Sequence, residues 1–565
     1  MSYLDVPRIY FAGKFMARPP TGNNRLDNYD PSVVLQTTTP EVQGDAEWHP
    51  RGTGEFRFLR CMVTAVVDEH YQVQANHPLV HSEIGTFAVD SSPKIVDLDP
   101  DQQNYAELFG MRITFADAFG KPFLTGLLDP PPVARDTWTR IPGEGSVWGN
   151  SGFFQSVLTR IERLSGAALD PTGTIDTMLR LGHNQLSMKF VVDNFGAGIQ
   201  DANKTFLITD PNFATGRLVG IIGPAKDDEP ATYLAGRRLL GTADKTVVSC
   251  APAPCVINTA ARKLTLDLSN SIQWQEDPEG HAGDAVDGTF FAGYRDPSGA
   301  IVTMPPELAY TTSAYMNTAG IYDLDLTDAQ LAYLAQRPIL VVLTSEAADV
   351  AILAERPDGV CIENEPVLAR LNAGETATVE LRARKFGVPL ARHTVGWRLD
   401  AINRWNNLPA DGVSFATPLT TDALGRATLT VTANRLHNLP SDRRHIQSQV
   451  YFLGGPWDGT HRGNAPGSMG SNTAFTVLVF AYGEAVAAPR WRDVQPILAQ
   501  YNRLYPGMRA IVQLDSLTIL RQNRQRMLDV LSHKIDEPNY MPVTRDLPAH
   551  DRQTLLNWLN AGCPE

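Results

Sequence analysis

The stretch VDLDP carries two carboxylates, Asp97 and Asp99, two residues apart. Alternate residues of a strand point to the same side, so this spacing would let the pair share a proton or bind a cation. The competing interpretation is a turn before Pro100, in which Asp99 caps a helix over Gln102–Phe109. The turn is the commoner use of such residues. We keep Asp97 and Asp99 as candidate catalytic residues beside it.

Three histidines stand in stretches where chemistry would be feasible. His77 and His81, in HPLVHSE, would share one face of a helix with Glu83 nearby, as zinc ligands do. Pro78 and the strand-like surroundings oppose a helix there, so a solvated turn is favoured and no metal site is expected. His183, in RLGHNQLSMKF, precedes a predicted strand and is the third candidate catalytic residue. A lone histidine in such a place more often has a structural hydrogen bond.

Several familiar catalytic motifs are missing from the sequence. There is no G-x-S-x-G elbow, no Walker motif and no G-x-G-x-x-G. A glycine-rich stretch runs from Gly454 to Ser471 and contains Trp457 and His461. Such a loop either lines a binding surface or serves as a connector. We therefore expect no bound cofactor, and the catalytic residues stay open.

Composition narrows the class of protein. The 565 residues are enough for about two to four domains. A formal net charge of −13 argues against a nucleic-acid partner, because such binding needs excess lysine and arginine. No run of about 18 apolar residues is present, so no membrane span is expected. We expect no partnership with a nucleic acid or a membrane.

The cysteines and the first residues favour a cytoplasmic protein. Asp5 and Arg8 interrupt the apolar N-terminus, whereas a signal peptide has an uninterrupted apolar segment. The five cysteines are an odd and sparse set, as in reducing compartments. Cys250 and Cys255 flank APAP, where they would pair across a tight turn or, as we favour, remain separate buried thiols.

Hydrophobic patterns predict a mainly β multidomain protein that begins with a β-rich domain over residues 1–350. In KLTLDL, from Lys263 to Leu268, strict alternation predicts a half-buried strand. Helices are predicted at Asp325–Gln336, after capping residues, and through Phe153–Leu164. The other predicted strands are Arg8–Phe11, Val63–Val67, Leu218–Ile222 and Ile339–Leu343.

The second and third predicted domains have different periods. Over 360–484, short alternating strands and the turn at Asp422–Gly425 resemble bacterial Ig-like domains and predict a β-sandwich. Over 489–565 the period is helical. The first helix carries an apolar stripe, the second is marked by residues between Leu517 and Leu531, and the third begins near Pro548 and ends at Gly562. The stripe of the first helix consists of Val494, Ile497, Leu498, Tyr501 and Tyr505.

The tail resembles a cytochrome c-like domain. DVQPILAQYNRLYPGM followed by YMPVTRDLPAHDRQTLLNWLNAG has the order of that family, but the C-x-x-C-H segment that attaches haem is absent. The resemblance implies a haem-less relative in which Tyr501 and Tyr505 fill vacated volume and depend on the rest of the chain for apolar neighbours. We expect Met541 to be core, and Arg545 with Asp546 to tie the tail to the preceding domain by a salt bridge. An ordinary helical tail is the alternative.

A wider resemblance covers most of the chain. YLDVPRIYFAGKFMARPPTGNN is similar to the start of the iminophenyl-pyruvate dimer synthases of bisindole pigment biosynthesis, of the violacein and rebeccamycin type. Further similar stretches follow in the same order as in that family. They are VDLDPDQQNYAELFG, TWTR, LVGIIG, YLAGRRLL, NTAGIYDLDL and NYMPVTRDL.

The resemblance reaches only the N-terminal half of that family. Its members continue into a ferritin-like region with glutamate and histidine metal ligands, and no Glu-x-x-His pair occurs here. The resemblance implies a role in specialised-metabolite biosynthesis, on an amino-acid-derived or aromatic intermediate. The chain would then be an enzyme, or the substrate-handling partner of a separate ferritin-like oxidase. The alternative from another class is a non-catalytic binding or scaffold protein.

One prediction follows from the missing attachment motif. The purified protein should carry no covalently bound haem, because the C-x-x-C-H motif whose thiols form the bonds is absent before Met541. The check is an absorption spectrum together with haem staining after denaturing gel electrophoresis. A Soret band that persists on the denatured chain would contradict this interpretation of the tail.

Overall fold

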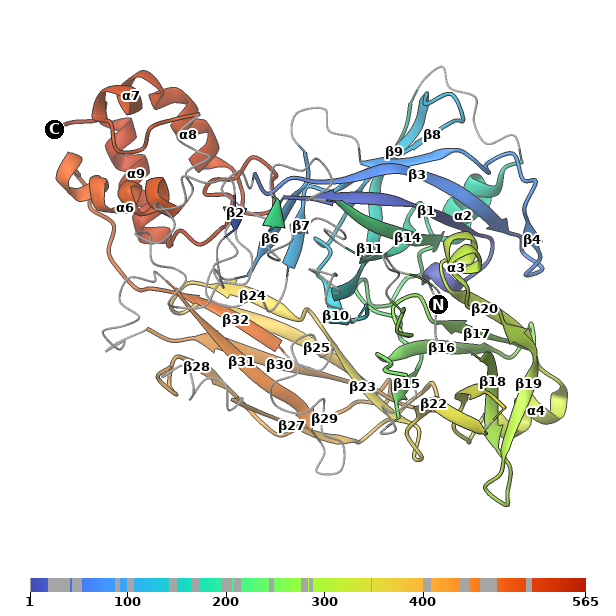
Figure 1. Ribbon diagram of the computed structural model, residues 1–565. Coiled ribbons are helices and arrows are strands. Elements are labelled where there is room, and N and C mark those ends of the chain that lie inside the picture. Colours follow the sequence, from blue (N-terminus) through green and yellow to red (C-terminus); the bar gives the residue numbers. More distant parts are fainter. Residues whose placement is uncertain are drawn as a thin grey trace.

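In the computed structural model, strands predominate over helices in the described part of the chain, and nearly all of them pair antiparallel (Figure 1). No helix in the described part of the chain is long and apolar enough to cross a membrane. The structure describes residues 2–18, 41–42, 53–86, 92–98, 106–141, 150–164, 172–194, 206–207, 215–242, 248–275, 283, 288–346, 348–399, 408–435, 448–457, 475–504 and 511–565.

The first sheet contains ten strands and closes on itself. They are β1 (Arg8–Ala17), β3 (Phe56–Val67), β4 (Val73–Gln74), β5 (Glu83–Thr86), β8 (Arg112–Ala116), β9 (Pro122–Leu128), β10 (Arg135–Thr139), β11 (Asn150–Arg163), β12 (Leu186–Asp193) and β14 (Thr215–Pro224). The order is β1, β14, β12, β11, β9, β8, β5, β3, and β3 pairs back with β1. The short strands β4 and β10 pair at the margins with β3 and β11.

Alternate residues of these strands fill the inside of the closed sheet. The rings of Phe154 and Phe190 stack there with centroids 5.2 Å apart, and Phe58 meets Phe190 edge-on at 5.1 Å. Gly220 is needed on β14, because a Cβ at that position would lie 2.1 Å from the ring of Phe11. The interior is therefore packed with its own side chains.

The second sheet is open and has eight antiparallel strands. They are β15 (Arg237–Gly241), β16 (Ala253–Asn258), β17 (Lys263–Asp267), β18 (Thr289–Arg295), β19 (Ile301–Leu308), β20 (Ile321–Asp325), β21 (Leu340–Thr344) and β22 (Asp349–Glu355). Their order is β19, β18, β21, β22, β15, β16, β17, β20. The outer face of the closed sheet, with Tyr10, Val191 and Val219, shares one core with this sheet.

Short helices and two small strand pairs complete this part of the chain. The helices are η1 (Ser2–Leu4), α2 (Thr174–Leu181), α3 (Thr312–Thr318) and α4 (Asp328–Leu334). The pairs are β2 (Glu41–Val42) with β13 (Phe206–Leu207), and β6 (Lys94–Asp97) with β7 (Ala106–Phe109). The predicted helix near Asp325–Gln336 is confirmed as α4, where Thr327 and Gln330 form a capping box.

Charged groups are buried where the two large sheets meet. The ammonium of Lys189 on β12 lies 2.5 Å from the carboxylate of Asp267 on β17, and the hydroxyl of Tyr3 donates to the same carboxylate at 2.6 Å. Arg8 on β1 forms an ion pair with Asp323 on β20. Burial alone would raise the pKa of Asp267, but Lys189 and the donated hydrogen bonds lower it below its ordinary range.

A third group of this kind surrounds Arg140. Its guanidinium is fully buried, forms an ion pair with Asp193 at 3.1 Å and donates to the hydroxyl of Tyr310 at 2.6 Å. It also lies 5.4 Å from the ring centroid of Trp274. Because Asp193 is on the closed sheet and the two aromatic residues follow strands of the second sheet, Arg140 connects the sheets.

Three predictions about this region are wrong. Phe153–Leu164 forms most of strand β11, not a helix, because it pairs with β12 on one side and β9 on the other. KLTLDL is a strand, but it is not half-buried. Thr265 and Asp267 are buried like the leucines, because Thr265 bonds to Asp323 and Asp267 pairs with Lys189. The helix expected to end at Phe109 is wrong because Ala106–Phe109 is strand β7.

The predicted Ig-like sandwich is present as two five-stranded sheets. One contains β23 (Val360–Glu365), β25 (Thr376–Lys385), β26 (Val388–Pro389), β28 (Val413–Phe415) and β30 (Arg426–Ala433). The other contains β24 (Leu368–Leu371), β27 (Thr394–Leu399), β29 (Leu419–Thr420), β31 (Ser448–Trp457) and β32 (Phe475–Phe480). Alternate residues of both sheets, among them Leu429, Val431 and Phe475, form the core between them.

In its described residues, the tail contains four helices around a separate core. They are α6 (Trp491–Leu504), α7 (Leu517–Gln522), α8 (Arg524–Ser532) and α9 (Ala549–Asn560). The single second helix that the sequence predicted is broken at Asn523 into α7 and α8. Pro548 and Gly562 flank α9 as predicted, and Gly562 has a φ of 86°.

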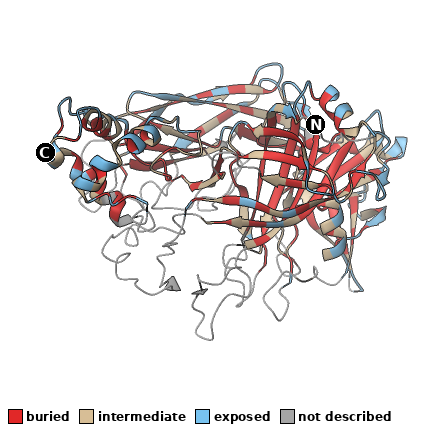
Figure 2. Ribbon diagram, turned by 90° about the horizontal axis from the view of Figure 1, so that it is seen from above, coloured by how far each residue is buried: buried red, intermediate tan, exposed pale blue. Residues whose placement is uncertain are grey.

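The parts of the chain meet through both apolar and charged contacts. Leu98 and Val133 pack with Val367, Leu478 and Phe480 of the sandwich. Figure 1 shows the tail beside the β6–β7 pair, and Figure 2 shows how much of the strand region is buried. The division into domains at 1–350, 360–484 and 489–565 remains a prediction about folding units, since β22 itself extends to Glu355.

The buried pair between the sheets can be tested by substitution. Asp267→Ala leaves the Lys189 ammonium buried without its partner, so it should cost about 3–5 kcal/mol and lower the melting temperature strongly. As a control, Asp176→Ala removes a solvent-exposed partner of Arg163 and should cost less than about 1 kcal/mol. The double variant Lys189→Met/Asp267→Leu should recover much of the loss. Equal melting temperatures for the Asp267 and Asp176 variants would contradict the assignment.

Candidate functional site

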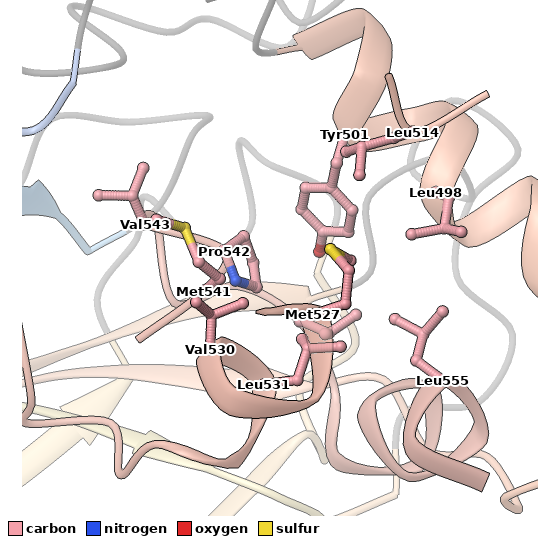
Figure 3. Close-up of a pocket in the computed structure, with 11 residues that line it drawn as sticks. Leu498, Tyr501, Leu514, Met527, Val530, Leu531, Met541, Pro542, Val543 and Leu555 are labelled. Atoms are coloured by element: carbon pink, nitrogen blue, oxygen red, sulfur yellow. The ribbon is translucent and has the colours of Figure 1, made fainter. Parts of the chain in front are cut away.

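An apolar cavity, partly open to the surface, lies in the helical tail (Figure 3). Its volume is about 70 Å³, several times the roughly 10–15 Å³ that one water needs. Almost all of the lining surface is carbon or sulfur. The lining residues are Leu498, Tyr501, Leu514, Met527, Val530, Leu531, Met541, Pro542, Val543, Leu547 and Leu555.

Five segments of the described chain supply the walls of the cavity, and one of them is the stretch before α7 that contains Leu514. Helix α6 contributes Leu498 and Tyr501 from its apolar stripe, and α8 contributes residues one turn apart, Met527 and Leu531. Helix α9 contributes Leu555, and the segment 541–547 closes another side. In Figure 3 the sulfur of Met527 lies next to the ring of Tyr501. The helical periods therefore bring these side chains together.

The structure revises the expected role of the α6 stripe. Val494, Ile497, Leu498 and Tyr501 are all buried in the tail's own core, so the stripe does not depend on the rest of the chain for its apolar neighbours. Tyr501 takes up part of the space beside the methionines but leaves a cavity. Tyr505, the other tyrosine expected to fill this volume, lies outside the described residues.

The cavity offers contact surface and little acid–base chemistry. Among the described lining residues Tyr501 alone has an ionisable side chain, and its hydroxyl interacts with the carboxylate of Asp546. Thr544 donates to the same carboxylate at 2.7 Å. Burial raises the pKa of Asp546 despite these hydrogen bonds. The arrangement is suited to holding a molecule, because its lining groups are apolar and two of them are polarisable thioethers.

The lining does not match the haem site of the family that the tail resembles. Met541 lines the cavity, as an axial methionine would, but the described lining contains no histidine and no cysteine. The donor set for attachment and for a second axial ligand is therefore lacking. Met541, which we expected to be core, is half-buried and lines the cavity without belonging to the buried core of the tail.

The salt bridge predicted for Arg545 and Asp546 is wrong, because Arg545 donates to main-chain carbonyls and Asp546 accepts from Thr544. Arg545 is fully buried, and its guanidinium carbon lies 4.0 Å from the ring centroid of Phe109 on β7. In the described part of the chain the charged pair at this junction is Arg370 of the sandwich with Glu107 of β7. Burial and the neighbouring Arg370 lower the pKa of Arg545 to about 9, which still leaves it charged at neutral pH.

The two candidate catalytic residues that the structure describes, Asp97 and His183, lie on different elements. Asp97 is half-buried on β6, opposite Ala106 of β7, and Asp99 lies outside the described residues. His183 is exposed after α2, and its Nδ1 lies 2.6 Å from a carboxylate oxygen of Asp227. His183 thus has the structural hydrogen bond that was the alternative to catalysis.

The other candidates also lack a reactive arrangement. The Nε2 atom of His77 lies 3.1 Å from the hydroxyl of Thr174, and His81 is in a turn with a φ of 71°. Among the described residues no group of three or more histidine, cysteine, aspartate or glutamate side chains is placed to hold a metal ion. The glycine-rich loop lies largely outside the described residues, apart from Gly454–Trp457 at the end of β31.

The five cysteines are all free thiols. Cys255 is buried on β16 and Cys250 is half-buried before it, so the pair expected as the less favoured alternative does not form. Burial raises the pKa of Cys250 and of Cys61 to about 12, and it raises the pKa of Cys255, Cys361 and Cys563 as well. These thiols are therefore poor nucleophiles at neutral pH.

Comparisons with known proteins give no information on what this site does. No protein-family model and no curated protein matches the chain. Solved structures give weak likenesses, such as domains 4 and 5 of the S-layer protein SbsC, at 13% identity over 44% of this chain and 98% of that one, with a TM-score of 0.14. The first four Ig domains of Dscam1 isoform 6.9 share 8% identity over 73% and 92% of the two chains, with a TM-score of 0.12. Alpha-2-macroglobulin from Escherichia coli shares 10% sequence identity over 86% of this chain and 33% of its own, with a TM-score of 0.14. Scores this low do not bear on function.

The buried carboxyl next to the cavity gives a pH-dependent prediction. Because the folded state raises the pKa of Asp546, stability falls as pH rises from the ordinary carboxyl pKa through the raised value. An Asp546→Asn variant lacks this loss, so its melting temperature relative to the wild type should be higher at pH 7 than at pH 4. Thermal melts of both proteins at the two pH values make the check. A difference that does not depend on pH would contradict the burial of an ionisable group there.

Proposed function

We propose that this protein binds a small uncharged aromatic molecule in the cavity of its tail and hands it on in specialised-metabolite biosynthesis. The apolar cavity is the observation that carries the proposal. The collinear resemblance to the N-terminal half of the iminophenyl-pyruvate dimer synthases supports the metabolic setting. In this role the chain works in the cytoplasm as the substrate-handling partner of a separate ferritin-like oxidase, which supplies the reactive metal.

Binding is favoured over catalysis by the chemistry of the cavity wall. A general acid or base must reach the reacting atom with a titratable side chain. In the described lining only Tyr501 is ionisable, and its hydroxyl is engaged with Asp546. Asp97 and His183, the candidates on described parts of the chain, are not among the lining residues.

The lining also decides which molecules are compatible. A carboxylate or ammonium placed there would lose its water and gain no charged partner, at a cost of several kcal/mol. A neutral ring loses little hydration and gains contacts with the leucines and with the sulfurs of Met527 and Met541. An amino-acid-derived ligand would therefore be one that has lost its charged groups, such as an indole.

Calorimetric titration of the full chain with indole tests this proposal. A ring of that size should bind with a dissociation constant of roughly 0.05–0.5 mM, from typical contact energies per atom. Val530→Phe places a ring in the cavity and should abolish binding. Leu528→Phe is the control, since Leu528 is on the same helix, is also half-buried and does not line the cavity.

A charged analogue gives the second arm of the test. Phenylpyruvate should bind at least tenfold more weakly than indole, because its carboxylate has no partner in the cavity. Tight phenylpyruvate binding, or indole binding that Val530→Phe leaves unchanged, would overturn the assignment of the cavity as the site.

A further inference from the structure

The segment from Met541 to Leu547 has two roles in the structure. Four of its seven residues line the cavity: Met541, Pro542, Val543 and Leu547. The other three, Thr544, Arg545 and Asp546, are buried. The segment is therefore a wall that has the cavity on one side and buried protein on the other.

Arg545 holds the segment in this position. Its guanidinium donates to the main-chain carbonyls of Ile535 at 2.9 Å, Glu537 at 2.9 Å and Val543 at 2.5 Å. The same guanidinium lies over the ring of Phe109, on strand β7 of the N-terminal region. One side chain thus connects the cavity wall to the loop after α8 and to a strand outside the tail.

Close backbone contacts reinforce the connection to the N-terminal region. A Cβ built on Gly54 would lie 2.8 Å from Cγ2 of Val543, so this cavity-lining residue also touches the N-terminal region directly. A Cβ built on Gly110, next to β7, would lie 2.7 Å from the ring of Pro538. These contacts leave no room for the tail to shift without disturbing the wall.

We propose that filling the cavity and docking the tail against the N-terminal region are coupled through the segment Met541–Leu547. This inference rests on the proposed binding function and adds its regulation. A ligand that packs against Val543 and Pro542 favours the position in which Arg545 reaches Phe109. Coupling between two sites is reciprocal. If a bound ligand strengthens the docking of the tail by some factor, then a substitution that abolishes docking must weaken ligand binding by that factor.

Two glycine substitutions in the full chain separate docking from general strain. Gly110 and Gly120 have similar backbone conformations, with φ of 65° and 78°. A Cβ at Gly110 meets Pro538, whereas one at Gly120 meets nothing within 4 Å. Gly110→Ala should therefore weaken indole binding by about tenfold, within the five- to 150-fold range of typical coupling. Gly120→Ala should leave binding within about twofold of the wild type.

A gentler variant guards against misfolding of Gly110→Ala. Phe109→Leu keeps an apolar side chain on β7 but removes the ring beneath Arg545, and it should weaken indole binding by about three- to tenfold. Melting curves show whether each variant is folded. An affinity for indole that equals the wild type in folded Gly110→Ala and Phe109→Leu would overturn the coupling.

Hydrogen exchange of the wild-type chain gives a readout that needs no variant. Indole should slow amide exchange in the cavity wall, residues 541–547, and also across the junction at Glu107–Gly110. Protection confined to the wall would overturn the coupling and leave the binding function standing. A wild-type chain that does not bind indole would overturn the proposed function and the coupling with it.

Discussion

The pairing of buried charges between the two large sheets is the constraint on which the N-terminal region depends. Lys189, Arg8 and Arg140 are almost fully removed from water, and each meets a carboxylate or a tyrosine hydroxyl across the packed faces. A buried charge without a partner costs several kcal/mol, while the apolar contacts around it tolerate small shifts. The charged pairs therefore restrict how the closed sheet and the open sheet can lie on each other.

The charged residues of these pairs stand in three well-separated stretches of the sequence. Arg8 is in LDVPRIYF, Arg140 ends TWTR, and Asp323 is in NTAGIYDLDL. In the structure the charged residues of all three stretches connect the two sheets, so their role is to fix the packing.

How far the sequence predicts the structure depends on whether the relevant contacts are local. The sandwich strands, the capped helix α4 and the end of α9 at Gly562 follow from alternation, caps and turn residues, and these predictions are confirmed. Phe153–Leu164 has apolar residues at helical spacing as well, and only its long-range pairing with β12 and β9 makes it a strand. The burial of Thr265 and Asp267 on β17 could not be predicted for the same reason, because their partners Asp323 and Lys189 are distant in sequence.

The cavity was beyond the reach of sequence reasoning for a related reason. Val530, Leu531 and Leu555 look like ordinary core residues, and a sequence pattern marks which side chains are buried but not where the packing between them is incomplete. The sequence feature that bears on this region is the presence of both Met541 and the apolar stripe of the first tail helix, without a haem to cover that stripe. That feature predicted a core position for Met541 and not a cavity, and the self-covered stripe and the position of Arg545 emerge only from the packing.

The distribution of thiols has a practical meaning. Each structural part contains at least one cysteine: Cys61 is in the closed sheet, Cys255 in the second sheet, Cys361 in the sandwich and Cys563 in the tail. None is paired, and all have suppressed thiolate character in the folded chain. An alkylating reagent therefore reacts slowly until a part opens, and the modified cysteine identifies which part that was. The molecule in this way contains its own set of regional reporters of partial unfolding.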